Sequence, residues 1–360
     1  MASSSPPEHA ASDRQNNFDA LRLALATLVL FSHSYVLAGD AEPIGRLTRH
    51  QLEGGSIAVD GFFVISGFLI TRSWIVSRST DDFLGKRIRR IYPGFLAATV
   101  VSIIIAAICS PTVRYLKFLA FATDDFVRTA LFLTYGALDN PAAFPSNPYP
   151  NAVNGSLWTL QPELFCYLLV AAAGILGALS RRRIILAIGA LIYAVYCAQT
   201  GTRLGATPTS FTRLLIYFVM GALAYLYRPT FGRPMLVVGS ILLMIVGNFI
   251  PPLLALTTPI TGTYLLLSVA FSRRIRLYNA AARGDLSYGV YLYAFVVQQA
   301  TVAVLHLAHR PLVVFAVALP VTYLAAWCSW HAVERRFIRR AGSRSSALTP
   351  APADQVLVPT

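Results

Sequence analysis

Apolar stretches of the sequence contain ionisable side chains that could transfer protons. Arg22 and His33 share the first stretch, and Asp60 and Glu163 lie in two later ones. A charge in membrane hydrocarbon costs about 2.5–3.5 kcal/mol even on a lenient scale, so such residues are functional or paired. His33 is the best candidate for a general base, because the unperturbed pKa of histidine is about 6.5 and leaves the neutral form abundant at pH 7. A carboxylate could orient its ring, and the sequence leaves the choice between Asp60 and Glu163 open.

Residue spacing predicts that these groups lie at a similar depth. Arg22 and His33 are eleven residues apart, about three helical turns, so they share one helix face and lie about 16 Å apart along its axis. Asp60 comes early in the next, inward-running helix. Glu163 lies about two turns inside the membrane interface that Trp158 marks. We therefore expect His33, Asp60 and Glu163 to form one layer, with Arg22 nearer the inner end.

Each of these residues also has a purely structural interpretation. His33 could be a neutral histidine that is hydrogen-bonded to a neighbouring helix. Asp60 and Glu163 could be ion-pair partners of Arg22 or Arg72.

A basic segment, Lys86–Pro93, follows the second apolar stretch. The guanidinium groups of Arg87 and Arg90 suit bidentate phosphate binding, although a basic cluster can also be a topology signal alone. Proline is favoured in the first turn of a helix, so Tyr92-Pro93 indicates a helix start. Ser66-Gly67 fits a small-residue packing contact better than a nucleophile.

Composition identifies an integral membrane protein. The chain of 360 residues is 56% hydrophobic and 13% charged, whereas soluble domains are about 25% charged. The mean hydropathy is +0.58. The net charge of +14 comes from Lys and Arg in short loops between apolar runs, which argues against nucleic-acid binding and for contact with anionic lipids or ligands. The four cysteines have no zinc-ligand spacing, and we expect no metal.

The hydrophobic pattern predicts an all-α, polytopic bundle of ten transmembrane helices in one domain, 18–338. We expect disordered tails at 1–17 and 339–360, and an external loop at 110–155 that includes a short interfacial or re-entrant helix. The predicted spans are 18–38, 56–77, 91–109, 156–178, 183–199, 211–227, 235–250, 253–271, 286–307 and 312–332.

The basic clusters support ten spans rather than eleven. With ten spans and both termini cytoplasmic, every cluster faces the cytoplasm, whereas an extra span near 113–137 would move the later ones outside. The clusters are Arg78–Arg90, Arg181–Arg183, Arg228–Arg233, Arg273–Arg283 and Glu334–Arg344.

Six stretches, in order along 18–338, resemble the acyltransferase-3 family of membrane O-acyltransferases. They are Phe18–Arg22 through His33, Asp60–Ile70, Arg87–Pro93, Ser156–Leu160 with Glu163, Leu286–Leu292, and Val333–Phe337.

The resemblance implies a ten-helix enzyme of the bacterial inner membrane that transfers an acyl group, usually acetyl, from cytoplasmic acetyl-CoA to a sugar hydroxyl. Acetyl-CoA would be a co-substrate, with no permanently bound cofactor. The family's Arg-x10-His pattern falls on Arg22 and His33, its paired arginines on Arg87 and Arg90, and its acid on Glu163.

The chain departs from the family pattern at two positions. Ala294 stands where members often have histidine, and Arg336 stands where proline often follows Glu-Arg. No hydrolase-like extracytoplasmic domain is recognisable, so we expect the chain to complete acylation itself or to pass the acyl group to an envelope biosynthesis partner.

The predicted site residues are therefore catalytic His33, Asp60 and Glu163. Arg22, Arg87 and Arg90 are the predicted donor-binding residues, because guanidinium groups suit CoA phosphates. The acceptor would be a surface glycan or a glycosylated metabolite, selected by the external loop. Two alternatives stay open: a glycolipid or small-solute transporter with a proton relay, and a scaffold subunit of an envelope assembly.

Overall fold

The computed structural model describes residues 16–110, 133, 143–201, 210–275, 277 and 284–338. Within these residues the secondary structure is helical, with no strand. The long helices are α2 (Phe18–Ala38), α4 (Gly54–Val76), α5 (Thr80–Cys109), α7 (Leu160–Ile175), α8 (Arg182–Gly201), α9 (Ser210–Tyr227), α10 (Pro234–Phe249), α11 (Leu253–Ala270), α12 (Ser287–Leu305) and α13 (Pro311–Ser329). Short helices are α3 (Pro43–Leu47), the 3-10 turns Leu157–Thr159 and Ala178–Ser180, and the π-helical turn Trp330–Glu334.

A helix occupies each of the ten ranges predicted to span the membrane. Eight of the helical segments in the described part of the chain are long and apolar enough to cross a bilayer, and two, α9 and α10, are shorter apolar helices. The all-helical prediction is therefore confirmed, while the number of crossings and the sides of the termini stay predictions. Most of the predicted tails and of the 110–155 loop lies outside the described residues.

The end of the predicted N-terminal tail is fixed to the bundle. Asn17 is buried, and its Nδ2 donates to the carbonyl oxygens of Val269 (3.0 Å) and Ile275 (2.9 Å). These bonds hold the start of α2 against the end of α11. Because Arg22 lies about one turn further along α2, they also fix its position.

The helix that carries the basic segment begins earlier than predicted. Ser79 caps α5 by accepting a hydrogen bond from the backbone N–H of Asp82 (3.1 Å), and acids in the first turn suit the positive end of the helix dipole. The prediction of a helix start at Tyr92-Pro93 was therefore wrong, since Pro93 lies inside α5. Arg87 and Arg90 consequently lie about one turn apart on one helix face.

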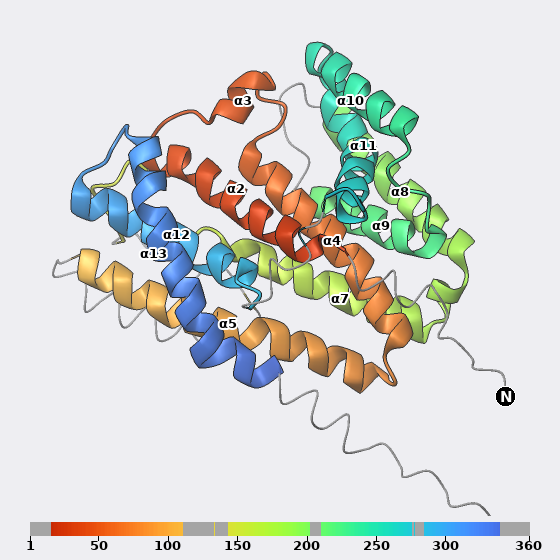
Figure 1. The fold of residues 1–360 in the computed structure, drawn as a ribbon, viewed down its shortest axis with the longest axis horizontal. Helices are drawn as coiled ribbons and strands as arrows, with labels where there is room; N and C mark the ends of the chain where they lie inside the picture. Colours follow the sequence, from red (N-terminus) through yellow and green to blue (C-terminus); the bar gives the residue numbers. More distant parts are fainter. Residues whose placement is uncertain are drawn as a thin grey trace, which may run out of the picture.

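The bundle is organised around α4 and α12, in each of which 72% of the apolar stretch is buried. Figure 1 shows α4 between two groups of helices, α8–α11 on one side and α2, α5, α12 and α13 on the other. The apolar faces of α8, α10 and α13 stay exposed, as expected for helices that face lipid.

Two glycines bring α4 and α9 into backbone contact. A Cβ on Gly67 would lie 1.9 Å from the carbonyl oxygen of Phe218, and a Cβ on Gly221 would lie 2.1 Å from that of Val64. Only glycine permits this approach, which is typical of small-residue interfaces between membrane helices. The contact fixes the rotation of α4 about its own axis. It therefore decides which side chains of α4 point away from α9.

Amide side chains join α12 to its neighbours beyond the first turn of the helix. Gln298 Nε2 donates to the carbonyl oxygen of Leu30 (2.7 Å) and to Ser34 Oγ (2.6 Å) on α2. Asn154 Nδ2 donates to the carbonyl oxygen of Leu292 (2.8 Å), just before α7 begins. These bonds hold α2, α7 and α12 in register in an interior where unsatisfied polar groups are costly.

Candidate active site

A cavity of about 660 Å³ lies between α2, α4, α5, α7 and the start of α12. Its lining combines aromatic and aliphatic side chains with charged groups at the N-terminal ends of α2, α5 and α12 and the C-terminal end of α4. A largely apolar pocket with a few convergent polar groups is the usual form of a small-molecule site.

Cations dominate the charged part of the lining. They are Arg22, Arg72, Lys86, Arg87, Arg89 and Arg90, and they face the two carboxylates Asp285 and Glu163. Within the described residues, the Nε atoms of Arg87 and Arg89 are buried without a hydrogen-bond partner. Arg87 Nη2 donates to Ser73 Oγ (3.4 Å). The lining therefore carries excess positive charge and free guanidinium donors, which suits a multiply charged anion.

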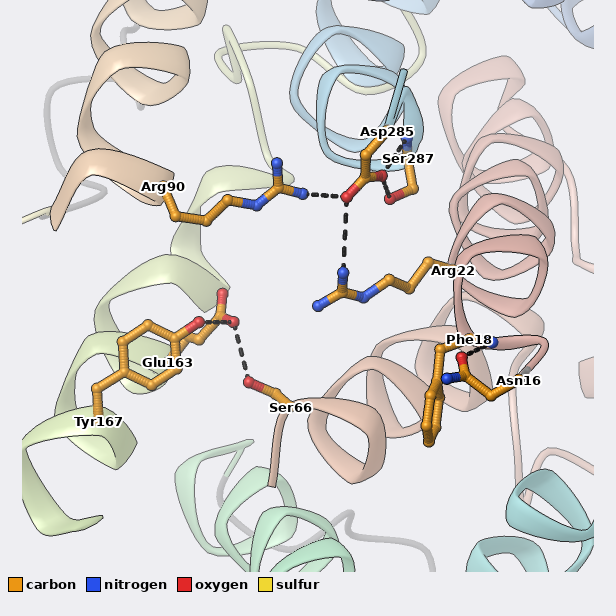
Figure 2. Close-up of polar contacts among 9 residues, drawn as sticks. All are labelled: Asn16, Phe18, Arg22, Ser66, Arg90, Glu163, Tyr167, Asp285 and Ser287. Carbon is orange, nitrogen blue, oxygen red and sulfur yellow. Dashed lines mark hydrogen bonds and ion pairs between the residues drawn. The ribbon is translucent and has the colours of Figure 1, made fainter. Parts of the chain in front are cut away.

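Asp285 gathers two of these cations. Its Oδ2 atom forms ion pairs with Arg90 and with Arg22 (3.5 Å for Arg22 Nη1), as Figure 2 shows. Its Oδ1 atom accepts hydrogen bonds from the backbone N–H (3.2 Å) and the hydroxyl (2.5 Å) of Ser287. Burial alone would raise the pKa of Asp285, but the two guanidinium groups and the Ser287 hydrogen bonds lower it to about 2. Asp285 is thus ionised at every physiological pH and holds both arginines at the cavity.

Glu163 lies in the first turn of α7, where the helix dipole favours an acid. Its Oε1 atom accepts hydrogen bonds from Ser66 Oγ on α4 (3.2 Å) and from the Tyr167 hydroxyl one turn later (Figure 2). The other carboxylate oxygen points toward Arg90 across the same space. Glu163, Ser66 and Tyr167 all line the cavity, so a carboxylate and two hydroxyls meet there beside the cations.

His33 is not among the residues that line the cavity. Its ring packs edge-to-face on Phe295 of α12, with the ring centroids 5.3 Å apart. Its Nδ1 atom is buried and has no hydrogen-bond partner within the described part of the chain. His33 therefore packs against Phe295 outside the cavity lining, and its Nδ1 atom is available for a further contact.

Asp60 lies on the α9 side of α4, away from the cavity lining. Its Oδ2 atom pairs with Arg213 Nη1 at 3.6 Å, and its side chain is 6% exposed. Of the predicted site residues, the structure thus brings Glu163 together with Arg22, Arg87 and Arg90, and it places His33 and Asp60 outside this group. Of the two interpretations of Asp60, the geometry favours the ion pair, with Arg213 rather than Arg22 or Arg72 as partner.

Sequence reasoning missed three residues of these clusters, Asp285, Arg213 and Tyr167, and it assigned Ser66 to helix packing. Asp285 comes two residues before the Ser287-Tyr288 motif, and Arg213 is a lone charge in the apolar run 211–227. Both signals were present, because an intramembrane or membrane-edge charge requires a partner. Ser66 and Tyr167 give no comparable signal. In the described part of the chain, no group of three or more His, Cys, Asp or Glu side chains could hold a metal ion.

Comparison with known proteins gives consistent matches over most of the chain. The family model described as an acyltransferase domain matches residues 15–331. An O-acetyl transferase of Shigella phage Sf6 is 30% identical over 341 residues, which cover 92% of this chain and 99% of that protein.

Two rhizobial proteins are also similar. Nodulation protein 10 of Rhizobium leguminosarum bv. viciae is 28% identical over 84% of this chain and 88% of its own length. The exopolysaccharide production protein ExoZ of Rhizobium meliloti (strain 1021) is 27% identical over 82% of this chain and 94% of its own length. No solved structure matches at a comparable level of significance.

Proposed function

The chain belongs to this acyltransferase family and is a multi-pass membrane O-acetyltransferase, and from this premise we propose that it transfers acetyl from cytoplasmic acetyl-CoA to a sugar hydroxyl of a surface glycan. The observation that carries the proposal is the cation-rich cavity, in which Glu163 and the two arginines on Asp285 face one another. The family assignment favours transfer over the transporter and scaffold alternatives.

The chemistry of the lining supports an acyl-CoA donor. Coenzyme A carries a diphosphate and a separate phosphate, and its pantetheine arm is long and only weakly polar. Arg22, Arg87 and Arg90 would bind phosphate oxygens as charge-assisted forks. The apolar part of the cavity, which includes Phe62 and Leu160, would receive the arm with its thioester.

The relatives support a glycan acceptor. One relative is named for exopolysaccharide production and another is an O-acetyl transferase of a bacteriophage. A polymer or lipid-linked glycan is too large for a cavity of about 660 Å³, so we propose that only the reacting sugar approaches the site, from the external side, with the predicted loop selecting it.

The proposed roles follow from the positions of the residues. Glu163 is the acid–base group of the donor cavity. His33 serves the acceptor hydroxyl from its place beside Phe295, where Nδ1 is available. Asp60, paired with Arg213, keeps α4 and α9 in the geometry that the site needs.

The proposed orientation puts the cationic end of the bundle in the cytoplasm. The charged ends of α2, α4, α5 and α12 that line the cavity belong to one end of the bundle, and basic residues favour the cytoplasmic side. A bacterial inner membrane would then give cytoplasmic acetyl-CoA direct access to the cavity.

Thermal unfolding of the purified protein with and without acetyl-CoA tests the proposal. A ligand that binds only the folded state at a hundred times its Kd adds about 2.7 kcal/mol of stability. We expect acetyl-CoA to raise the unfolding temperature of the wild type, and to raise it much less in an Arg87→Ala/Arg90→Ala variant. Arg233→Ala, at an exposed position before α10, is the control. Equal protection of all three proteins would reject the cavity as the donor site.

A further inference from the structure

The hydroxyl of Ser66 is directed into the cavity. Several other hydroxyls of the transmembrane helices donate to the carbonyl four residues earlier in the helix, among them Thr27, Ser34 and Thr99. That local bond is the default for Ser and Thr where water is scarce. Ser66 Oγ donates instead to Glu163 Oε1, at 3.2 Å, on a helix far away in the sequence. Its hydroxyl is therefore committed to a carboxylate.

The neighbouring glycine explains why Ser66 has this orientation. Gly67 is pressed against the backbone of α9, where its Cβ would meet the carbonyl oxygen of Phe218. Successive residues of a helix point about 100° apart, so locking Gly67 toward α9 turns Ser66 toward α7. The packing role expected for Ser66-Gly67 thus belongs to the glycine, and the serine side chain faces Glu163 in the cavity.

A third group orients the carboxylate. Tyr167 donates its hydroxyl to the same Oε1 atom of Glu163, from one turn further along α7. A hydroxyl within hydrogen-bond reach of a base, with that base held by another residue, is the arrangement that activates serine nucleophiles. In Figure 2 the guanidinium end of Arg22 points toward the space in front of this group, so positive charge lies beside the hydroxyl and the carboxylate.

Asp285, the other carboxylate of the cavity lining, is not suited to act as the base for Ser66. Asp285 forms ion pairs with two arginines and accepts two hydrogen bonds from Ser287. Its pKa of about 2 makes it a poor base. Among the described residues that line the cavity, Glu163 is thus the group able to take a proton from a hydroxyl. His33, the predicted base, is outside the lining.

We propose that Ser66 is the nucleophile that first receives the acyl group, with Glu163 as its base, so that transfer proceeds through an acyl-serine ester. This inference rests on the proposed function, because it needs an acyl-thioester donor in the cavity. It divides the reaction into a donor half, in which the thioester acylates Ser66, and an acceptor half, in which a sugar hydroxyl attacks the ester.

The two half-reactions balance. Ser66 Oγ attacks the thioester carbonyl carbon as its proton passes to Glu163 Oε1. The C–O bond forms, the C–S bond breaks, and Glu163 gives the proton to the leaving sulfur, which departs as the thiol of CoA. The acceptor hydroxyl then attacks the ester carbonyl, its proton replaces the one lost from Ser66 Oγ, and the acylated sugar leaves.

Trapping the ester is the direct test. The purified full-length protein is mixed with isotope-labelled acetyl-CoA without acceptor, quenched in acid, and mapped by peptide mass spectrometry. We expect one acetyl group on Ser66. Ser66→Ala should lose the label and lower glycan acetylation by about 100-fold or more, the scale of a lost catalytic group. Glu163→Gln should form the ester at least about 100-fold more slowly.

A cysteine variant separates catalysis from folding. Ser66→Cys keeps a nucleophile of similar size, and its label should become a thioester that neutral hydroxylamine releases, unlike the oxygen ester of the wild type. Ser240→Ala, on the peripheral helix α10, is the matched control and should behave as the wild type. Protection by acetyl-CoA against thermal unfolding checks that each variant is folded.

The outcomes also distinguish this inference from the proposed function. If the wild type acetylates glycan but carries no label at residue 66, or if Ser66→Ala keeps its activity, the acyl-serine step is wrong and direct transfer stands. If acetyl-CoA neither protects the wild type nor labels it, and no glycan is acetylated, the proposed donor and the ester are rejected together.

Discussion

Arg22 and Arg90, on two different helices, reach the same oxygen atom, Oδ2 of Asp285 (Figure 2). Two guanidinium groups repel each other unless an anion lies between them. The carboxylate keeps them close together at the cavity. The site is thus prepared for an anion before any donor arrives, and this preorganisation lowers the free-energy cost of binding.

Asp285→Asn should destabilise the protein and weaken donor binding. Removing one partner of a buried ion pair costs about 3–5 kcal/mol. Since Asp285 is 17% exposed and Arg22 26%, we expect the lower part of that range or slightly less. The donor KM should rise more than kcat falls. Asp40→Asn, which breaks the exposed pair with His309 (3.0 Å), is the control and should cost about 0–1 kcal/mol. A variant as stable as the wild type would contradict the role of Asp285.

The contribution of Asp285 should depend on pH only under acidic conditions. The pKa of its carboxyl group is lowered in the folded protein to about 2 from 3.8, so the ionised form stabilises the fold above pH 3.8 and the benefit is lost as the pH falls toward 2. The difference in unfolding free energy between wild type and Asp285→Asn should be constant from pH 8 to about 5 and should shrink below about 4. Thermal melts of both proteins across this range measure it. A difference that changes between pH 6 and 8 would point to another titrating group.

Arg87→Gln should weaken donor binding without unfolding the protein. The Nε atom of Arg87 is buried without a hydrogen-bond partner among the described residues, and the hydrogen bond from Arg87 Nη2 to Ser73 Oγ is long at 3.4 Å. A charge-assisted hydrogen bond contributes about 1.5–3 kcal/mol, so we expect the donor KM to rise about 10- to 100-fold. Initial-rate kinetics with varied acetyl-CoA measure it, and Arg233→Gln serves as a control outside the cavity lining. An unchanged KM would remove Arg87 from the donor site.

Gly67→Ala should separate α4 from α9. The new methyl group would lie 1.9 Å from a backbone oxygen that cannot move alone, and such overpacking costs about 1–3 kcal/mol or more. Gly239→Ala, on α10, is the matched control, because nothing lies within 4 Å of its added Cβ. There the better helix propensity of alanine should leave stability unchanged or raise it by up to about 1 kcal/mol. Thermal unfolding in detergent compares the two, and equal melting temperatures would contradict the close contact.

Asp60 and Arg213 should behave as a coupled pair. Asp60→Asn and Arg213→Gln each leave one charge buried alone, so each should destabilise the protein, whereas the double variant should recover much of that stability. Acetylation activity measured on the same three proteins then decides the role of Asp60. Activity that returns in the double variant assigns Asp60 to structure. Recovered stability without activity would keep it among the catalytic residues.

The sequence predicts the elements of this protein better than it predicts their contacts. Apolar length alone placed a helix at every predicted span, intramembrane charge pointed to Glu163 and Arg22, and the basic segment after the second span pointed to Arg87 and Arg90. The residues that these charged side chains contact could not be predicted in the same way. A helix turns about 100° per residue, so a small rotation decides whether Asp60 faces the cavity or α9. That rotation is set by Gly67 and Gly221, each of which packs against the backbone of the other helix. These contacts exist only in the folded protein, so the sequence does not reveal them.

The contacts between α2 and α12 occur at two heights. Arg22 meets Asp285, just before α12, at one height, and Gln298 donates to Leu30 and Ser34 at the other. Two helices joined at two separated points are restrained from sliding or tilting independently. Changes in the distances among Arg22, His33 and Phe295 are therefore restricted, and displacement of α4, α5 or α7 is the expected way to widen the cavity for an incoming donor.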